Sequence, residues 1–87
     1  MVYYVYLIKT LDGYSEKTYV GYTNNLRKRL EKHNKGRGAK STKGRMWKVL
    51  YTEKYLTKGE AISREYYIKK NRKVRDQIKD KFKWKRK

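Results

Sequence analysis

The segment Tyr19–His33 constrains the fold of this chain more than any other stretch. A β-branched and aromatic run ends there at Gly21, and short polar side chains follow it. Thr23 or Asn24 can cap a helix, because a side-chain oxygen there can accept a hydrogen bond from an unpaired N–H of the first turn. We therefore predict a strand that ends at the glycine and a helix over residues 24–34.

One face of this predicted helix carries an unusual mixture of side chains. At 100° per residue, the face that should turn toward the core comprises Leu26, Arg29, Leu30 and His33. A buried guanidinium or imidazole costs free energy unless it has hydrogen-bond partners. We therefore expect Arg29 and His33 to be partnered, and we treat them as candidate functional residues.

Composition narrows the class of protein. The chain has 87 residues, 26 Lys and Arg against 8 Asp and Glu, and a net charge of +18. This length suits one domain with a small core and no cofactor-enclosing cavity. The charge predicts a polyanionic partner, with nucleic acid favoured over an acidic membrane surface. Without cysteine, and with one histidine, a metal ion would have to bind carboxylate and water oxygens.

No membrane or export signal is expected. The longest apolar run, residues 2–8, is far shorter than the roughly 20 residues that span a bilayer. No basic region precedes it and no small-residue cleavage site follows it. We therefore expect an intracellular, cytoplasmic protein with no membrane partner, and association with the nucleoid is an open alternative.

The chain order predicts an antiparallel sheet. Residues 2–9 and 17–22 are rich in β-branched and aromatic side chains, and Leu11-Asp12-Gly13 supplies a turn between them. Their pairing would bring Tyr6 close to Tyr19. Residues 46–56 predict a third strand. The fold class is thus α/β (α+β), with a three-stranded antiparallel sheet flanked by helices.

The loop over residues 35–45 is rich in glycine and cations. Three glycines would let the backbone approach a phosphate closely, and Lys and Arg could bind it. A solvated connecting loop is the alternative. The cations expected to contact nucleic acid here and on the neighbouring helices are Arg27, Lys32, Lys35, Arg37, Lys40, Lys43, Arg45, Lys69, Lys70 and Arg72.

A second helix is predicted from Thr57, which forms a capping box with Glu60, through Lys70. Its expected apolar face comprises Ala61, Ile62, Tyr66 and Ile68. Glu65 projects between these residues, where a carboxylate is costly unless it is paired or binds a cation. An ion pair with Arg29, a position at the core edge and a metal site remain open.

A third helix should follow, because Val74, Ile78 and Phe82 recur every four residues. We expect one domain over residues 1–82. Residues 83–87 would form a basic tail, in which one tryptophan could stack on a base.

These motifs together resemble the GIY-YIG nuclease family, over about residues 3–78. Tyr19-Val20-Gly21 and the following Asn-Leu-Arg-Lys-Arg-Leu are similar to the second half of its signature, and Tyr4-Val5-Tyr6 stands where the first triplet is expected. The closest similarity is to small single-domain bacterial and archaeal members, which share the glycine-rich loop. Ala61 and Glu65-Tyr66-Tyr67 resemble the segment that holds the family's metal-binding glutamate.

The resemblance implies an endonuclease that hydrolyses phosphodiester bonds, with DNA more favoured than RNA and with branched or damaged DNA as candidates. Its implied site residues are Tyr6, Tyr19, Arg29, His33 and Glu65, which should share one concave surface. Glu65 would hold one Mg²⁺ or Mn²⁺ ion and Arg29 would clamp a phosphate oxygen. Tyr19, or less favourably His33, would take a proton from water, and Tyr6 would orient the water or Tyr19.

Two alternatives account for the charge and the small size. One is a non-catalytic or weakly active nucleic-acid-binding module of the same fold, and the other is a ribosome- or RNA-associated basic protein. The sequence also departs from the family pattern. Tyr22 stands where repair-type members carry a lysine, and Asn71 comes too early for the asparagine that some members place after the glutamate helix.

Overall fold

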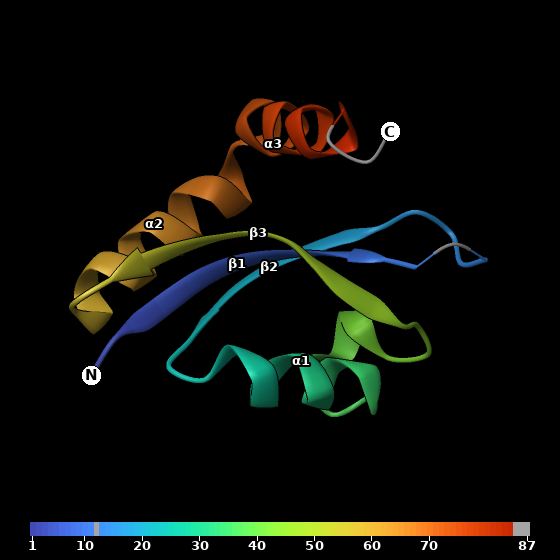
Figure 1. Cartoon of the computed structure of the whole chain (residues 1–87), viewed down its shortest axis with the longest axis horizontal. Helices are drawn as coiled ribbons and strands as arrows, with labels where there is room; N and C mark the ends of the chain where they lie inside the picture. Colours follow the sequence, from blue (N-terminus) through green and yellow to red (C-terminus); the bar gives the residue numbers. More distant parts are fainter. Residues whose placement is uncertain (12, 85–87) are drawn as a thin grey trace.

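The protein folds as one three-stranded sheet with helices on both faces (Figure 1). The computed structural model describes the backbone of residues 1–11 and 13–84 and side chains up to residue 81. The elements in chain order are β1 (Tyr3–Thr10), β2 (Thr18–Thr23), α1 (Leu26–Asn34), the 3₁₀ turn η1 (Lys40–Thr42), β3 (Trp47–Tyr55), α2 (Lys58–Lys70) and α3 (Arg72–Trp84). The predicted fold class is confirmed.

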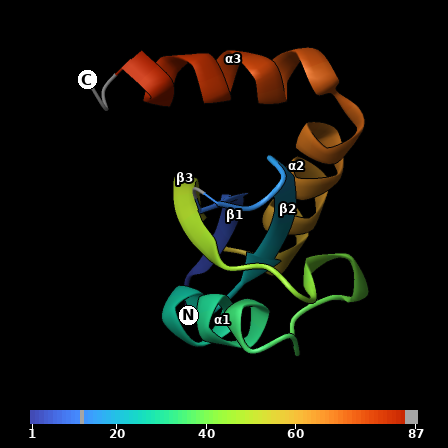
Figure 2. The same cartoon turned by 90° about the vertical axis from the view of Figure 1, so that its right-hand side faces the viewer.

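The strand order is β2-β1-β3, and both pairings are antiparallel. β1 is therefore the central strand, as its continuous apolar run predicts. Helix α1 lies on one face, while α2 and α3 lie on the other, and α2 runs beside the edge strand β2 (Figure 2). Because side chains alternate along a strand, successive residues of β1 serve different faces.

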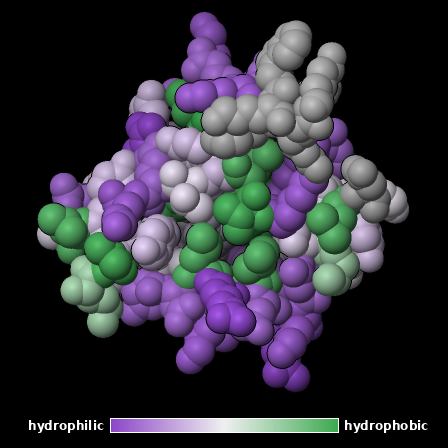
Figure 3. Space-filling model, viewed as in Figure 1, coloured by the Kyte–Doolittle hydropathy of each residue, from purple (hydrophilic) through white to green (hydrophobic). Residues whose placement is uncertain are grey.

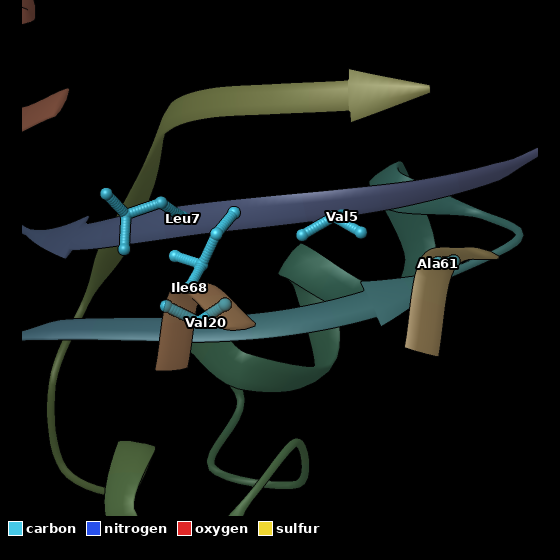
Figure 4. Close-up of a cluster of buried hydrophobic side chains, with 5 residues drawn as sticks. All are labelled: Val5, Leu7, Val20, Ala61 and Ile68. Carbon is cyan, nitrogen blue, oxygen red and sulfur yellow. The ribbon is translucent and has the colours of Figure 1, made fainter. Parts of the chain in front are cut away.

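The core on the α2 face comprises Val5, Leu7, Val20, Ala61 and Ile68 (Figure 4). Val74 and Ile78 of α3 pack against it, which confirms that part of the predicted stripe. The register of β1 with β3 shifts between Leu7 and Ile8, where β3 carries one extra residue. This bulge lets the consecutive residues Leu50 and Tyr51 both pack on the α2 face.

The core on the α1 face is built around Tyr6, Ile8 and Trp47. Leu26 and Leu30 of α1 pack against it, as the predicted helix face requires. Figure 3 shows the side of the molecule on which β3 lies in front. Hydrophobic residues gather in the middle of this side, and hydrophilic residues surround them. Lys48 and Lys54 lie on this edge strand, and such charges discourage pairing with another chain.

Helix α1 begins at Leu26, two residues later than predicted. Asn25 is the cap, and its side-chain oxygen accepts from the N–H of Lys28 at 3.1 Å. Thr23 acts one step earlier, because its hydroxyl oxygen accepts from the N–H of Asn25 at 3.1 Å and shapes the turn. Predicting the cap at Thr23 or Asn24 was wrong because Thr23 is already used in that turn.

The predicted apolar face of α2 is wrong at two positions. Ala61 and Ile68 are buried, but Ile62 is 43% exposed and Tyr66 is 60% exposed. The helix packs along β1 and β2 through a narrow stripe, so only residues spaced like Ala61 and Ile68 reach the core. The predicted Thr57 cap is confirmed, since its hydroxyl oxygen accepts from the N–H of Glu60 at 3.2 Å.

Helix α3 extends through Trp84, beyond the predicted domain boundary at residue 82. The side chain of Phe82 and the tail residues 85–87 lie outside the described residues. So does Asp12, although the turn is recognisable because Gly13 has a positive φ of 98°.

Candidate active site

Four of the five predicted site residues gather between the sheet and α1. We call Tyr6, Tyr19, Arg29 and His33 the site cluster. The ring centroids of Tyr6 and Tyr19 are 6.4 Å apart, and those of Tyr19 and His33 are 5.0 Å apart. The expected proximity of the two tyrosines is confirmed.

Gly21 makes room for this arrangement. It is the residue opposite Tyr6 in the β1–β2 register. A methyl group on Gly21 would overlap the hydroxyl oxygen of Tyr6 and lie 2.6 Å from its Cζ atom. The glycine is therefore required because the Tyr6 ring lies directly across the backbone of β2.

His33 is fully buried, and both ring nitrogens have partners. Thr42 has one hydroxyl proton, which it donates to the carbonyl of Ala39 at 2.9 Å, so its oxygen accepts from Nδ1–H of His33 at 3.0 Å. Nε2 of the neutral ring then accepts the hydroxyl proton of Tyr6 at 2.9 Å. Burial, with help from Arg29, lowers the pKa of His33 to about 4.

The glycine-rich loop closes over the imidazole. A methyl group on Gly38 would overlap the His33 ring, and the indole N–H of Trp47 donates to the carbonyl of Thr42 at 3.0 Å. Part of this loop therefore packs against His33 and holds it in place, a role that was not predicted from the sequence. The contact between Thr42 and His33 was not predicted either. The only available signal was a hydroxyl nine residues after a histidine that was expected to need a partner.

Arg29 is half-buried and points its guanidinium between the loop and the sheet. Nε donates to the hydroxyl oxygen of Tyr6 at 3.2 Å, and Nη2 donates to the carbonyl of Gly38 at 3.4 Å. The hydrogen bond to Tyr6 keeps the pKa of Arg29 above its usual value, so the group stays charged. No carboxylate of the described residues forms an ion pair with it.

A hollow of about 400 Å³ adjoins the site cluster. It lies on the β2 side of the sheet, where Figure 2 shows η1 and α2. Its wall is formed by Thr18, Tyr19, Val20, Ser41, Lys69 and Arg75. Tyr19 is half-buried and thus links the site cluster to this solvent-facing hollow, whereas Tyr6 is 1% exposed. Burial also raises the pKa of Tyr6.

Glu65 comes from α2, beyond the edge strand β2. Its Oε2 atom lies 3.2 Å from Nζ of Lys69, and Lys69 shares the hollow with Tyr19. The charge of Glu65 also reaches Tyr6, where it is a minor cause of the raised pKa. Glu65 pairs with Lys69 and forms no ion pair with Arg29. Glu65 therefore lies beside one lining residue of the hollow and not within the site cluster.

The ten cations expected to bind nucleic acid are spread over α1, the loop and the C-terminal helices. All are exposed except Arg45, which is half-buried and donates to the carbonyl of Lys43 at 3.5 Å. Lys70 lies over the ring of Tyr66 at 5.5 Å, and Arg72 pairs with Asp76 at 3.8 Å.

A second polar cluster, unforeseen from sequence, ties β3 to α2. Arg64 donates to both carboxylate oxygens of Glu53, at 2.7 and 3.0 Å. The hydroxyls of Tyr51 and Tyr55 donate to the same carboxylate. Although burial opposes it, this set of donors lowers the pKa of Glu53 to about 2. We call Tyr51, Glu53, Tyr55 and Arg64 the Glu53 cluster.

Residues 1–11 and 13–84 contain neither a cluster of metal ligands nor a membrane-spanning helix. No three His, Cys, Asp or Glu side chains there come together as metal ligands. Within the same part of the chain, no helix has the length and apolar character needed to cross a bilayer.

Comparison with known proteins identifies the class. Residues 2–79 match the family model described as the GIY-YIG catalytic domain. The chain therefore belongs to the GIY-YIG family, which is a nuclease family that acts on nucleic acid and generally uses a divalent metal ion.

Its relatives are small stand-alone bacterial proteins. A UPF0213 protein of Clostridium perfringens is 54% identical over 68 residues, which cover 77% of this chain and 70% of the relative. One from Oceanobacillus iheyensis is 47% identical over 68 residues, covering 77% and 76%. The solution NMR structure of a UPF0213 protein from Bacillus halodurans has a TM-score of 0.53 and 35% identity, and the match covers 92% of this chain and 84% of that one.

Proposed function

We propose that this protein is a metal-dependent endonuclease that hydrolyses phosphodiester bonds, with DNA as the preferred nucleic acid. The observation that carries the proposal is the state of Arg29. Its charged guanidinium is fixed by Tyr6 and Gly38, has no carboxylate partner among the described residues and lies beside Tyr19. A phosphate oxygen is the anion that such a preorganised fork binds well.

Hydrolysis needs a base for the attacking water and stabilisation of charge on the phosphate. In this proposal the phenolate form of Tyr19, favoured by the neighbouring positive charges, accepts the proton of the water, since Tyr19 lines the hollow, and Arg29 stabilises the charge that develops on the phosphate. The hydroxyl of Tyr6 is bonded to both His33 and Arg29, which supports a positioning role for Tyr6. His33 is likewise assigned positioning, because neither ring nitrogen is free to accept a proton from water.

The divalent ion would bind to Glu65. One carboxylate and several waters would suit a single Mg²⁺ or Mn²⁺ ion, because hard cations bind oxygen ligands and keep part of their hydration shell. Lys69 competes for that carboxylate, but its side chain is 51% exposed and can move into solvent. When bound, the ion would supply positive charge for the phosphate and the leaving oxygen.

Glu65→Gln tests this proposal, with Glu31→Gln as the control. Both changes remove one negative charge from a helix, and Glu31 is exposed and forms no ion pair with any described residue. We expect Glu65→Gln to lower Mg²⁺-dependent plasmid nicking by at least about 100-fold. It should also abolish Mn²⁺ binding measured by titration calorimetry, while DNA affinity stays equal or becomes slightly tighter.

Melting temperature separates chemistry from stability in the same experiment. The Glu65–Lys69 ion pair is worth only about 0.5 kcal/mol, because the Lys69 side chain is 51% exposed although that of Glu65 is 16% exposed, so Glu65→Gln should melt close to the wild type. Nicking by Glu65→Gln at the wild-type rate would refute Glu65 as metal ligand. A wild-type protein that binds DNA without nicking any duplex, branched or single-stranded substrate would support the binding-module alternative.

A further inference from the structure

The hollow beside Tyr19 contains more cationic groups than the hydrolysis of one phosphate requires. Arg29 already serves the phosphate that is cut, yet Lys69 and Arg75 also line the hollow. Its volume of about 400 Å³ suits a phosphodiester with part of its nucleotide better than a single ion. The hollow therefore has room for a portion of the strand beyond the cut.

Arg75 is held rigidly at the wall of this hollow. Its Nη1 donates to the carbonyl of Ile68 at 2.9 Å and also to that of Lys69, so the end of α2 anchors the first turn of α3. No carboxylate of the described residues forms an ion pair with Arg75. A fixed, uncompensated guanidinium loses little side-chain entropy when it binds an anion.

Two other side chains complete a polar wall. Lys69 contributes an ammonium group that can turn from Glu65 toward an incoming anion, because it is half-exposed. Ser41 is an exposed lining residue from η1, an element separate from α2 and α3. A phosphate bound here would therefore be contacted from separate elements of the chain.

We propose that this hollow binds a second phosphate of the substrate strand, next to the phosphate held by Arg29. Arg75 is its main ligand, and Lys69 and Ser41 are supporting ligands. This inference rests on the proposed function and narrows its substrate class. The protein acts on a continuing strand with consecutive phosphates, and a small diester with a single phosphate cannot use both sites.

The test introduces a negative charge into the hollow with Ser41→Glu and uses Ser63→Glu as the control. Both serines are exposed, and Ser63 lies on α2 in a different surface depression, beside Arg64 and Tyr67. Affinity for a short DNA duplex is measured by fluorescence anisotropy at several salt concentrations. We expect Ser41→Glu to weaken binding at least tenfold and Ser63→Glu to weaken it no more than twofold.

Salt dependence gives a second readout. Loss of one phosphate contact should make the log–log slope of affinity against salt shallower by about 0.9 for Ser41→Glu, and leave it unchanged for Ser63→Glu. Arg75→Gln keeps an amide donor for the carbonyls of α2 and removes the charge. It should also weaken binding about tenfold, with melting temperature recorded to detect any loosening of the α2–α3 corner.

The outcomes separate this inference from the proposed function. If wild type nicks DNA and Ser41→Glu binds and nicks like Ser63→Glu, the hollow proposal is overturned while the nuclease proposal stands. If wild type nicks nothing but Ser41→Glu selectively weakens binding, the hollow is supported and the nuclease proposal fails.

Discussion

The site cluster and the Glu53 cluster lie on opposite faces of the same sheet. They contain the same types of side chain but pair them differently. In each, an arginine from a helix is grouped with two tyrosines from the strands. In the Glu53 cluster a carboxylate takes two hydrogen bonds from Arg64 and neutralises it. In the site cluster Arg29 donates to the Tyr6 phenol and the Gly38 carbonyl, and no carboxylate of the described residues pairs with it.

This difference separates a structural arginine from a binding one. Arg64 and Glu53 satisfy each other, so their cluster fixes β3 against α2 and has little to offer an external anion. Arg29 is equally well oriented, but its charge is left for a ligand. In the proposed function, the arginine without a carboxylate partner among the described residues is the one that binds phosphate.

The largest effect should come from exchanging lysine for arginine in each cluster. Arg29→Lys keeps the charge and loses the forked geometry, so nicking should fall about 10²–10³-fold with little change in melting temperature. Arg64→Lys breaks the two-bond contact with Glu53, so it should lower stability by roughly 1–2 kcal/mol, because Arg64 is partly exposed. Nicking per folded molecule should be unchanged in Arg64→Lys.

Nicking rate and urea unfolding, measured on both variants, test the comparison directly. Equal losses of activity in Arg29→Lys and Arg64→Lys would mean that the carboxylate partner does not distinguish the two arginines. A strongly destabilised Arg29→Lys protein that still nicks would assign Arg29 a structural role.

Much of the site cluster could be predicted from sequence, because its geometry depends on local patterns. The alternation of β1 and β2 and the helical spacing of Arg29 and His33 are set by periods of two and 3.6 residues. Proximity of Tyr6 to Tyr19 then followed from pairing two adjacent strands. These features needed no knowledge of distant packing.

The rest depends on how separate elements meet. The exposure of Ile62 and Tyr66 reflects where α2 crosses the sheet, and the pairing of Glu53 with Arg64 joins residues from different elements. The position of Glu65 on α2, outside the site cluster, follows from the same crossing. Sequence periodicity gives the face of a helix but not the part of the sheet that this face covers.

Replacing a glycine by alanine near each cluster should give the next largest effect. Gly21→Ala forces a methyl group into the Tyr6 phenol, so we expect a loss of about 2–3 kcal/mol and a clear drop in nicking. Gly59→Ala has open space around it, in the first turn of α2 near the Glu53 cluster, and should be neutral or stabilise by about 0.5 kcal/mol. Thermal unfolding of both variants measures this. A Gly21→Ala protein as stable and active as Gly59→Ala would contradict the proposed packing of Tyr6 over β2.

The smallest expected effect is the loss of folding stability in acid. The two clusters should lose their contributions to stability in different pH ranges. The pKa of His33 falls from 6.5 in the unfolded chain to about 4 in the folded one, so the unfolded state binds more protons between these values. Stability from His33 is thus complete above pH 6.5 and declines as pH falls. The expected loss by about pH 5 is about 2 kcal/mol.

Glu53 acts at lower pH with the same sign. Its pKa falls from 4.5 to about 2 on folding, so its contribution is present above pH 4.5 and is lost as pH decreases toward 2. Urea unfolding as a function of pH should then show one decline that His33→Gln removes and a second, more acidic one that Glu53→Gln removes. Stability that stays constant between pH 7 and 5 in the wild type would show that His33 gains a proton without breaking its bonds to Tyr6 and Thr42. The site cluster would then tolerate a second cation beside Arg29, and the assignment of His33 as a neutral positioning residue would fail.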